Sequence, residues 1–327
     1  MKKIAIIGAG KAGLTAAHHL KDIAQISLFE KSRGLGGRLS TRREEPYFFD
    51  HGAQYFTAKS EAFKKFLQPL IQKDVIKPWH ARVAQIENRQ IIEIENWGED
   101  HPRYVGAPAM NAIGKFLADG LDIHRNIRIE ALHKDADYWT LIDQEKNAIG
   151  PFDWVLSAMP APQMLALFPP DFSGYGRAQS IEMQACFALM LGFKTPLPLE
   201  FDAAQIKGED IGWVAMNHTK PDREGGYCLV IHSSNDWAQA HIDDDREEVQ
   251  RYLCRLASNI LGHDLESANF MALHGWRYAN ALLLGGLPYM LDENLHLAAC
   301  GDWCVEGKVE GAFQSGHELA NKIKQFL

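Results

Sequence analysis

No segment of this 327-residue chain approaches the ~20 consecutive uncharged apolar residues of a membrane-spanning helix, so we expect no membrane partner. Several catalytic patterns are missing as well. The chain has no Cys-x-x-Cys, no His-Glu-x-x-His and no Cys/His cluster with ligand spacing, so we expect no metal site. It also lacks the Gly-x-Ser-x-Gly turn of serine hydrolases. These absences argue against a metalloenzyme and against a serine hydrolase.

Positive charge is in deficit, because 34 Lys and Arg face 42 Asp and Glu and the net charge is −8. No basic stripe with interleaved aromatic residues is present, so we expect no nucleic-acid partner. A polyanionic small-molecule substrate would need local arginine or lysine side chains to offset the overall charge.

Cysteine is scarce, and the odd count of five in a long chain argues against a disulfide scaffold. We therefore interpret Cys300 and Cys304 as reduced thiols rather than as a redox pair. The start of the chain, two lysines and an apolar stretch, has some likeness to a secretory signal peptide. Lys11 interrupts that stretch and an intact glycine motif runs through it, so we expect a cytoplasmic protein.

The N-terminal segment carries a dinucleotide fingerprint in a strand–turn–helix–strand context. An apolar run over 4–7 enters a turn with Gly8, Gly10 and Gly13. The first glycine allows the tight turn, the second lets the backbone approach a pyrophosphate, and the third lets helix and strand pack closely. Glu30 lies about 20 positions later, at the end of a second apolar run, where an acidic residue accepts hydrogen bonds from the adenosine ribose. This arrangement predicts a dinucleotide site.

The residues after Glu30 indicate that the dinucleotide is FAD. Gly34-Leu35-Gly36-Gly37-Arg38 follows, and a plain NAD dehydrogenase does not need Gly-Gly-Arg here. The segment resembles the FAD signature of amine-oxidase-like and glutathione-reductase-like flavoproteins. Its glycines leave room for the ribityl–pyrophosphate chain, and Arg38 can reach a phosphate or the flavin edge. We interpret Arg42 and Arg43 as a solvated basic loop.

The far end of the chain agrees with this interpretation. An apolar run over 295–300 predicts a buried strand, and Gly301-Asp302 follows it. Apolar residues at helical spacing from 312 to 323 predict a helix that opens near Val309. In FAD proteins of this fold, the Gly-Asp pair contacts the ribityl or phosphate region. The helix N-terminus then stabilises negative charge on the reduced ring.

Segments 30–43 and 49–57, with later blocks at Lys220-Pro221, 232–237 and 276–279, resemble the renalase family of FAD oxidoreductases, especially its bacterial members. Asp222-Arg223 departs from the pattern, which has Gly-Arg after Lys-Pro. The resemblance implies non-covalent FAD and oxidation of the 2- and 6-dihydro isomers of NAD(P)H. A hydride passes to the flavin, NAD(P)+ leaves, and O2 is reduced to H2O2.

The FAD-binding residues that these motifs and the resemblance imply come from six parts of the chain. Gln54 and Tyr55 should lie near the flavin ring, and Ile129 should neighbour the adenine through its backbone, as the equivalent strand does in relatives. The full set is Gly8, Gly10, Lys11, Ala12, Gly13, Glu30, Lys31, Gly36, Gly37, Arg38, Gly52, Ala53, Gln54, Tyr55, Ile129, Ala158, Gly301, Asp302, Val309, Glu310, Gly311 and Ala312.

Substrate contacts are expected on a strand near residue 276. Hydride departure from a dihydronicotinamide creates an aromatic cation and needs no strong base, so we expect aromatic walls and polar orienting groups rather than a triad. On a strand, His274, Trp276 and Tyr278 share one face and Arg277 points the other way. We predict these four residues, together with His232 at another strand end, as the catalytic set; a core strand with an aromatic stripe is the alternative.

The predicted fold class is α/β, with a Rossmann-like FAD-binding domain and a second, mixed α+β substrate domain, as in p-hydroxybenzoate hydroxylase and amine oxidases. The FAD-binding domain is discontinuous and takes 1–57, 104–164 and 293–327; the substrate domain takes 58–103 and 165–292. Within the latter we expect a hairpin over 82–97, a helix over 249–260 and strands at 184–193, 211–217, 226–232 and 270–278.

Two other functions remain open. One is an FAD-dependent amine oxidase or desaturase of the same fold. The other is a flavin-free binding protein like the GDI proteins that chaperone prenylated GTPases, which the presence of Glu30 and Gly-Gly-Arg disfavours.

Overall fold

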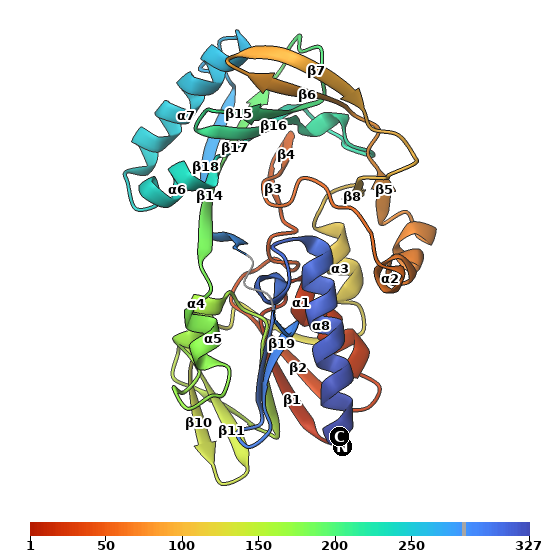
Figure 1. Cartoon of the computed structure of the whole chain (residues 1–327), viewed down its shortest axis with the longest axis vertical. Helices are drawn as coiled ribbons and strands as arrows, with labels where there is room; N and C mark the ends of the chain where they lie inside the picture. The colour runs from red at the N-terminus through yellow and green to blue at the C-terminus, as the bar shows by residue number, and fades with distance from the viewer. Residues whose placement is uncertain (283–285) are drawn as a thin grey trace.

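The computed structural model describes residues 1–282 and 286–327 and has two lobes joined by extended segments (Figure 1). The lobe that holds both termini is built on a six-stranded sheet with the order β19-β20-β13-β1-β2-β9. Its strands are β1 (Lys3–Ile7), β2 (Gln25–Glu30), β9 (Asp122–Arg125), β13 (Trp154–Ser157), β19 (Tyr289–Asp292) and β20 (Leu297–Cys300). All neighbours run parallel except β19, which is antiparallel to β20.

Two layers cover this sheet, which explains why its central strands are apolar on both faces. One face packs on α1 (Lys11–Leu20) and α8 (Val309–Ile323), with α2 (Glu61–Gln72) and α3 (Ala112–Leu117) beside them. The other face packs on a small sheet of β10 (Ile129–Asp135), β11 (Tyr138–Asp143) and β12 (Ala148–Phe152), with α4 (Ala161–Leu165) and α5 (Tyr175–Gln179).

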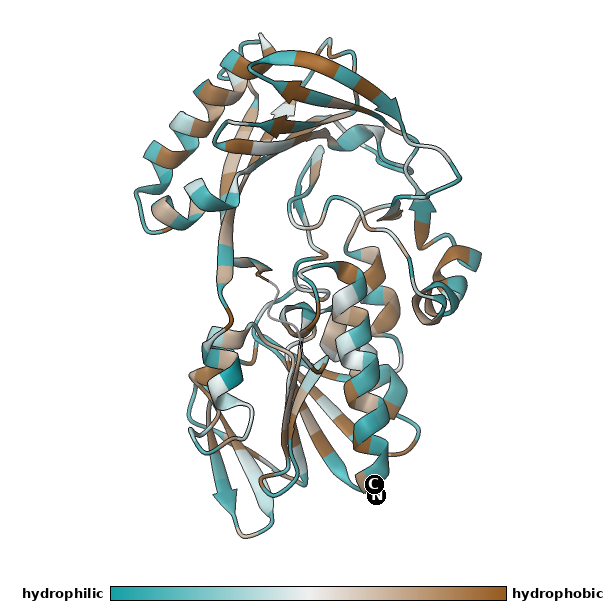
Figure 2. Cartoon of the chain, in the orientation of Figure 1, coloured by the Kyte–Doolittle hydropathy of each residue, from teal (hydrophilic) through white to brown (hydrophobic). Residues whose placement is uncertain are grey.

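The second lobe is a seven-stranded sheet with the order β18-β14-β17-β16-β15-β6-β7. Its strands are β6 (Arg82–Glu87), β7 (Gln90–Asn96), β14 (Met183–Phe193), β15 (Ala203–Lys207), β16 (Ile211–Met216), β17 (Tyr227–Ser233) and β18 (Phe270–Ala281). One face is apolar and packs on α7 (Arg246–Leu261) and α6 (Asn235–His241) (Figure 2). The other face is turned toward the first lobe.

A hairpin from the first lobe reaches this inner face. It consists of β3 (Thr41–Glu44) and β4 (Tyr47–Asp50), and Tyr47 and Phe49 pack on Met190, Cys228 and Val230 of the sheet. A short pair, β5 (Ile76–Pro78) with β8 (Tyr104–Gly106), lies between the lobes (Figure 1). The two lobes are therefore in direct contact around the hairpin.

The predicted fold class is confirmed, and the predicted elements over 82–97, 184–193, 211–217, 226–232, 249–260 and 270–278 are present. Arg42 and Arg43 lie on strand β3 and not on a loop; Arg42 pairs with Glu44 and stacks on Phe270, while Arg43 is exposed. The helix α2, which falls in the range assigned to the substrate domain, packs Phe63 against Phe313 of α8. Among the described residues, no helix is long and apolar enough to cross a membrane.

Candidate active site

The glycine turn after β1 has the geometry that a phosphate-binding loop requires. Gly8 has a φ of +107°, which only glycine adopts without strain. A Cβ on Gly13 would lie 2.1 Å from the Gly8 carbonyl oxygen, so helix and strand pack at main-chain distance. Gly10 differs, because its φ is −77° and no protein atom lies within 4 Å of its would-be Cβ. The fold itself does not require a glycine at position 10.

Glu30 holds this turn in place. Its Oε2 accepts a 2.9 Å hydrogen bond from the Ala9 N–H, and its Oε1 accepts a 2.8 Å bond from the Ser32 N–H. The second glycine segment lies against the first, because the Gly36 N–H donates to the Ala9 carbonyl at 2.9 Å. Gly36 and Gly37 have φ values of +97° and +57°. The two fingerprints therefore form one main-chain cradle at the N-terminus of α1, which no side chain caps.

Arg38 joins this cradle to the C-terminal segment. Its guanidinium donates to both carboxylate oxygens of Asp302, at 2.5 and 2.8 Å, and to the Ala279 carbonyl at 2.7 Å. Burial opposes the charge on Arg38, but the Asp302 carboxylate outweighs it and raises the pKa of the guanidinium above its usual value. A Cβ on Gly52 would lie 1.9 Å from the Arg38 carbonyl oxygen, so the chain after β4 also packs here.

Above the cradle, the inner face of the large sheet presents a row of ring side chains. Strand pairing places His274, Ala188, His232 and Trp213 directly opposite one another on β18, β14, β17 and β16. Residues opposite one another on neighbouring strands share a face. Ala188, the small residue between the two histidines, is fully buried.

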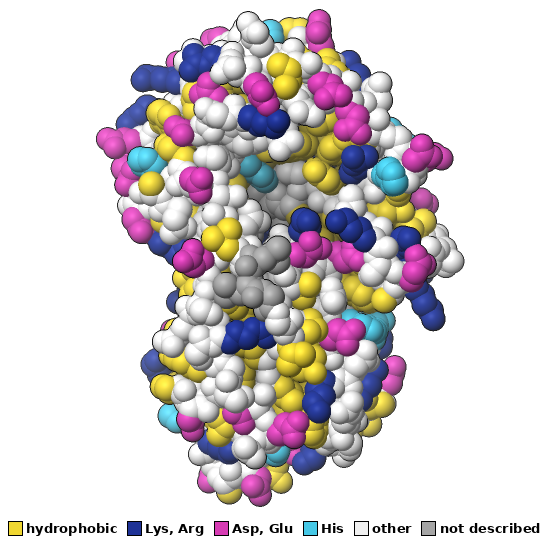
Figure 3. All heavy atoms as spheres, in the orientation of Figure 1, with side chains coloured by type: hydrophobic (Ala, Val, Ile, Leu, Met, Phe, Trp, Pro, Cys, Tyr) yellow, Lys and Arg dark blue, Asp and Glu magenta, His cyan; other side chains and the backbone are white. Residues whose placement is uncertain are grey.

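His51, which follows the hairpin, lies against His232, His274 and Trp276. We call these four residues the wall. The His51 ring stacks on Trp276 at 5.3 Å and meets His274 edge-on at 5.0 Å. The His51 carbonyl accepts hydrogen bonds from Trp276 Nε1 at 2.9 Å and from His232 Nε2 at 3.2 Å. His232, His274 and Trp276 are therefore brought together as predicted, around a histidine that the predicted set omitted. Figure 3 shows the hollow between the lobes, with histidine and basic side chains at its edge.

The wall is uncharged at neutral pH. Burial lowers the pKa of His232 and of His274 to about 4 in each case, and nearby cations act in the same direction. Burial also lowers the pKa of His51. Because a carbonyl can only accept, Nε2 of His232 carries the proton and Nδ1 is an acceptor.

Beside the wall, three buried charged groups meet on the inner face. Asp50 accepts from Arg223 at 2.5 Å and from Lys220 at 3.4 Å, and all three side chains are at most 2% exposed. Burial lowers the pKa of Lys220 to about 8, although Asp50 opposes this shift. The Gln54 amide oxygen accepts from Lys220 at 3.2 Å. The signal in the sequence was Asp50 and Lys220-Pro221 in the family-like blocks, but nothing there showed that they meet.

Comparisons with known proteins agree with this geometry. A sequence model of NAD(P)-binding Rossmann-like domains matches residues 6–70. A model of flavin-containing amine oxidoreductases matches residues 97–324, which is more than half of the chain. The chain belongs to the flavin-containing amine oxidoreductase family. The predicted amine-oxidase-like flavoprotein and its FAD are confirmed.

Solved structures of similar fold cover nearly the whole chain of this amine oxidoreductase. A candidate protoporphyrinogen oxidase from Exiguobacterium sp. 255-15 gives a TM-score of 0.81 at 11% identity, over 100% of this chain and 99% of that one. A triple mutant of putrescine oxidase gives 0.74 at 14%, over 100% and 99%. Cyclohexylamine oxidase from Brevibacterium oxydans IH-35A gives 0.74 at 12%, over 99% of both chains. At these identities the comparison establishes a shared fold.

The cradle of this amine oxidoreductase fits FAD. A diphosphate accounts for the open space beside Gly10, and the uncapped N-terminus of α1 supplies N–H donors to it. The N-terminus of α8 has no side-chain cap either. We propose that main-chain groups of the segments around Gly10 and Gly36, with Arg38 and Asp302, hold the cofactor.

Several residues predicted to bind FAD have side chains engaged elsewhere. Lys11 is buried with its Nζ 3.9 Å from the centre of the Phe66 ring, so only its main chain faces the cradle side of α1. Glu310 accepts from the N–H groups of Lys59 and Ser60 at 2.8 and 2.7 Å, so its carboxylate holds the two residues that precede α2. Lys31 is exposed, and its Nζ lies 3.4 Å from the Gln163 amide oxygen.

The remaining predicted cofactor residues lie at the cradle through their main chains or pack nearby. Ile129 is buried in the core between the six-stranded sheet and β10–β12. The Ala158 N–H donates to the Ile7 carbonyl at 2.8 Å, and the Ala158 carbonyl borders Gly8. The Gly301 N–H donates to Ser315 Oγ at 2.8 Å, next to Asp302. Ala12, Ala53, Val309, Gly311 and Ala312 lie on the same turns and helix starts.

Two residues predicted as catalytic do not join the wall. Arg277 lies on the opposite face of β18, where its exposed guanidinium pairs with Asp243. The alternation of side chains along a strand accounts for this placement. Tyr278 is partly buried further along the same strand.

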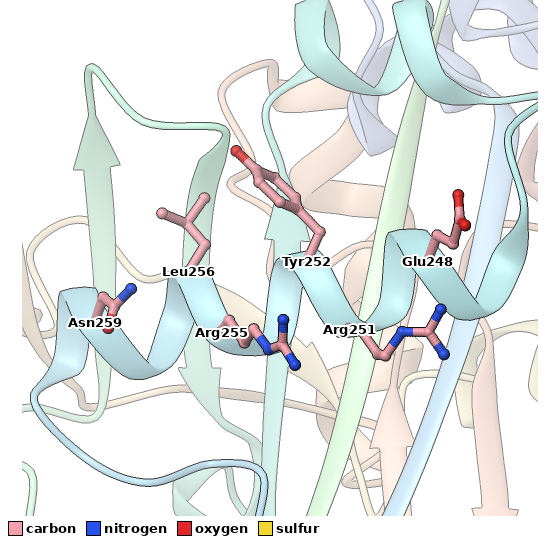
Figure 4. Close-up of a pocket in the computed structure, with 6 residues that line it drawn as sticks. All are labelled: Glu248, Arg251, Tyr252, Arg255, Leu256 and Asn259. Carbon is pink, nitrogen blue, oxygen red and sulfur yellow. The ribbon is translucent and has the colours of Figure 1, made fainter.

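A shallow depression of about 300 Å³ lies on the exterior of this amine oxidoreductase (Figure 4). Its lining residues, Glu248, Arg251, Tyr252, Arg255, Leu256 and Asn259, all come from α7. Because α7 covers the face of the large sheet opposite to the wall, this depression has no part in the site.

Proposed function

We propose that this chain is an FAD-dependent oxidase of the 2- and 6-dihydro isomers of NAD(P), as the resemblance to renalases implies. The supporting observation is the electrostatic character of the wall. The cations that act on His274 are Arg246 and Arg42, and the one that acts on His232 is Lys220. Asp50, the carboxylate near His51, is already paired with two cations. The described residues around the wall thus offer an ammonium substrate no unpaired carboxylate, which favours a neutral ring.

The chemistry comes from the cofactor, and the protein positions the substrate. FAD held by Arg38, Asp302 and the main chain around Gly10 and Gly36 would supply a hydride acceptor for the dihydropyridine, which would leave as aromatic NAD(P)+. The two electrons and one proton of the hydride, with one proton from solvent, would reduce O2 to H2O2. Trp276 and His51 offer flat surfaces against which a planar ring packs. The Nδ1 of His232 is an acceptor for the carboxamide N–H of a nicotinamide. No residue needs to remove a proton from the substrate carbon.

A second candidate is an amine oxidase of the same family. Putrescine oxidase bound to putrescine is among the solved structures of similar fold, with a TM-score of 0.70 at 13% identity over 99% of both chains. The aromatic face of Trp276 could attract an ammonium group. Against this, the described wall contains no carboxylate to pair with such a group, and Asp50, the carboxylate near His51, is already paired with Lys220 and Arg223.

Anaerobic mixing of the holoenzyme with single substrates separates the two functions. We expect 2-dihydro- and 6-dihydro-NAD(P) to bleach the oxidised flavin absorbance rapidly. Ordinary 4-dihydro-NADH, putrescine and cyclohexylamine should leave it oxidised on the same timescale. Readmitted O2 should restore the spectrum and yield one H2O2 per flavin. Bleaching by an amine alone would overturn the proposal in favour of the amine oxidase.

A further inference from the structure

At the far end of the row of ring side chains, a second aromatic group lies beside the guanidinium of Arg103. Tyr55, Trp97 and Trp213 form it: the Trp97 and Trp213 rings stack at 6.2 Å, and Tyr55 meets them at 4.7 and 5.7 Å. The Arg103 guanidinium lies 4.7 Å from the centre of the Trp97 ring. We propose that this group binds the adenosine diphosphate half of the substrate, an inference that rests on the proposed dinucleotide substrate.

The position of the group suits the second half of a dinucleotide. Trp213 is directly opposite His232 on the neighbouring strand, and the two side chains share the inner face. From His274 to Trp213 the row crosses three strand intervals, which amounts to about 14 Å. A ring packed on Trp276 and His51, next to His274, therefore leaves a second flat surface at Trp213 more than one ring's width away. The two rings of a dinucleotide, joined by a diphosphate, require such a separation.

The chemistry of the group suits an adenine and a diphosphate. The Trp213 indole N–H is buried and has no hydrogen-bond partner in the protein. Its ring is partly exposed and can stack on a base. The Tyr55 hydroxyl lies in the field of Arg103 and Lys308, which come from separate parts of the chain. Lys308 is paired with Glu306, so Arg103 is the cation of this group that suits phosphate oxygens.

Arg103 is only partly neutralised in the protein. Its nearest carboxylate, Glu95, lies 3.7 Å away and is 55% exposed, so the pair is weak. Its NH1 group donates to the His101 carbonyl, which fixes the guanidinium over Trp97. A planar cation held in this way keeps donors available for a phosphate. The group therefore combines stacking and positive charge within one part of the hollow.

The test uses the FAD-loaded protein and two probes, ADP-ribose and dihydronicotinamide mononucleotide. By titration calorimetry, Arg103→Gln should weaken ADP-ribose binding about tenfold or more. Trp213→Phe should weaken it severalfold while preserving most of the packing. In anaerobic flavin reduction, Arg103→Gln should raise the dihydro-NAD concentration that gives the half-maximal reduction rate by a similar factor and leave the limiting rate unchanged. The mononucleotide, which lacks the adenosine half, should react equally with wild type and variant.

Arg89→Gln is the matched control, because Arg89 pairs with Glu209 on an exposed turn far along the sheet. It should behave as wild type with both probes. Unchanged ADP-ribose binding in Arg103→Gln, or an equal effect on the mononucleotide and the dinucleotide, would overturn the subsite. If no dihydro isomer reduces the wild-type flavin while ADP-ribose still binds in an Arg103-dependent way, the proposed reaction fails and the subsite stands.

Discussion

Arg38 and Asp302 form a bidentate ion pair across a sequence separation of 264 positions. Arg38 ends the second glycine segment, and Asp302 follows the last strand of the six-stranded sheet. Asp302 is 5% exposed at its side chain, whereas Arg38 is 31% exposed and also donates to the Ala279 carbonyl of β18. The pair thus ties both ends of the cofactor lobe to a strand of the substrate lobe.

Loss of this pair should weaken both folding and FAD retention. Arg38→Gln leaves a buried carboxylate without its cation, and we expect a loss of about 2–4 kcal/mol in the free energy of unfolding. The double variant Arg38→Gln/Asp302→Asn should be less destabilised than the sum of the single variants, since neither charge then remains unpaired. Urea denaturation with free FAD in excess measures this coupling. Additive single losses would show that the pair contributes little.

A substitution at Gly10 should weaken FAD binding without changing the stability of the apoprotein. Since nothing in the protein lies within 4 Å of its would-be Cβ and its φ is −77°, Gly10→Ala should fold with wild-type stability when FAD is absent. Its methyl group should occupy the space of a diphosphate and weaken FAD binding at least tenfold. Thermal melts of the apoprotein and fluorescence titration with FAD check the two statements.

The matched control is Gly13→Ala, whose Cβ would lie 2.1 Å from the Gly8 carbonyl oxygen. It should lower the yield of folded protein whether or not FAD is present. Wild-type FAD affinity in Gly10→Ala would contradict the placement of the diphosphate.

The sequence predicts the cradle well because its geometry is local. Gly8 and Gly13 sit in a turn whose shape depends on neighbours within a few residues, so their spacing carries the information. The long apolar run of β14 (Met183–Phe193) likewise predicts a buried strand of the substrate lobe. The hairpin β3–β4 was missed because its charged first strand, Thr41–Glu44, lacks an apolar alternation.

The wall was predicted only in part, because it depends on pairing between distant strands. Alternation along β18 puts His274 and Trp276 on one face, but only the register of three strands places His232 and Trp213 in the same row. His51 follows the β3–β4 hairpin of the other lobe, and its carbonyl accepts hydrogen bonds from Trp276 and His232. No spacing in the sequence encodes that convergence.

Substitutions of Asp50 and of Lys220 in the buried cluster with Arg223 should change the free energy of unfolding by different amounts. Asp50→Asn leaves Lys220 and Arg223 as two buried cations, and we expect a loss of about 3–5 kcal/mol in the free energy of unfolding. Lys220→Met retains the Asp50–Arg223 pair and removes a cation whose charge burial disfavours. Its stability at pH 7 should lie within about 1 kcal/mol of wild type, or above it.

The pH dependence of the Lys220 variant provides the check. Burial lowers the pKa of Lys220 from 10.5 to about 8, so between these values the unfolded chain binds a proton that the folded protein has released. Stability of the wild type relative to Lys220→Met should therefore rise as the pH increases from 8 toward 10.5. Urea denaturation at several pH values measures the difference, and a flat difference would refute the assignment.

The neutral histidines of the wall should make the protein sensitive to acid. Burial lowers the pKa of His232 and His274 from 6.5 to about 4, so between these values the unfolded chain binds protons that the folded protein does not. The free energy of unfolding should fall as the pH decreases from 6.5 to 4, on the order of 1–2 kcal/mol for each partly buried ring. The variant His232→Asn/His274→Asn should lose most of this dependence, measured by denaturation at fixed ionic strength. His133→Asn, at an exposed position, should keep the wild-type dependence, and an identical loss there would show that the wall histidines are not responsible.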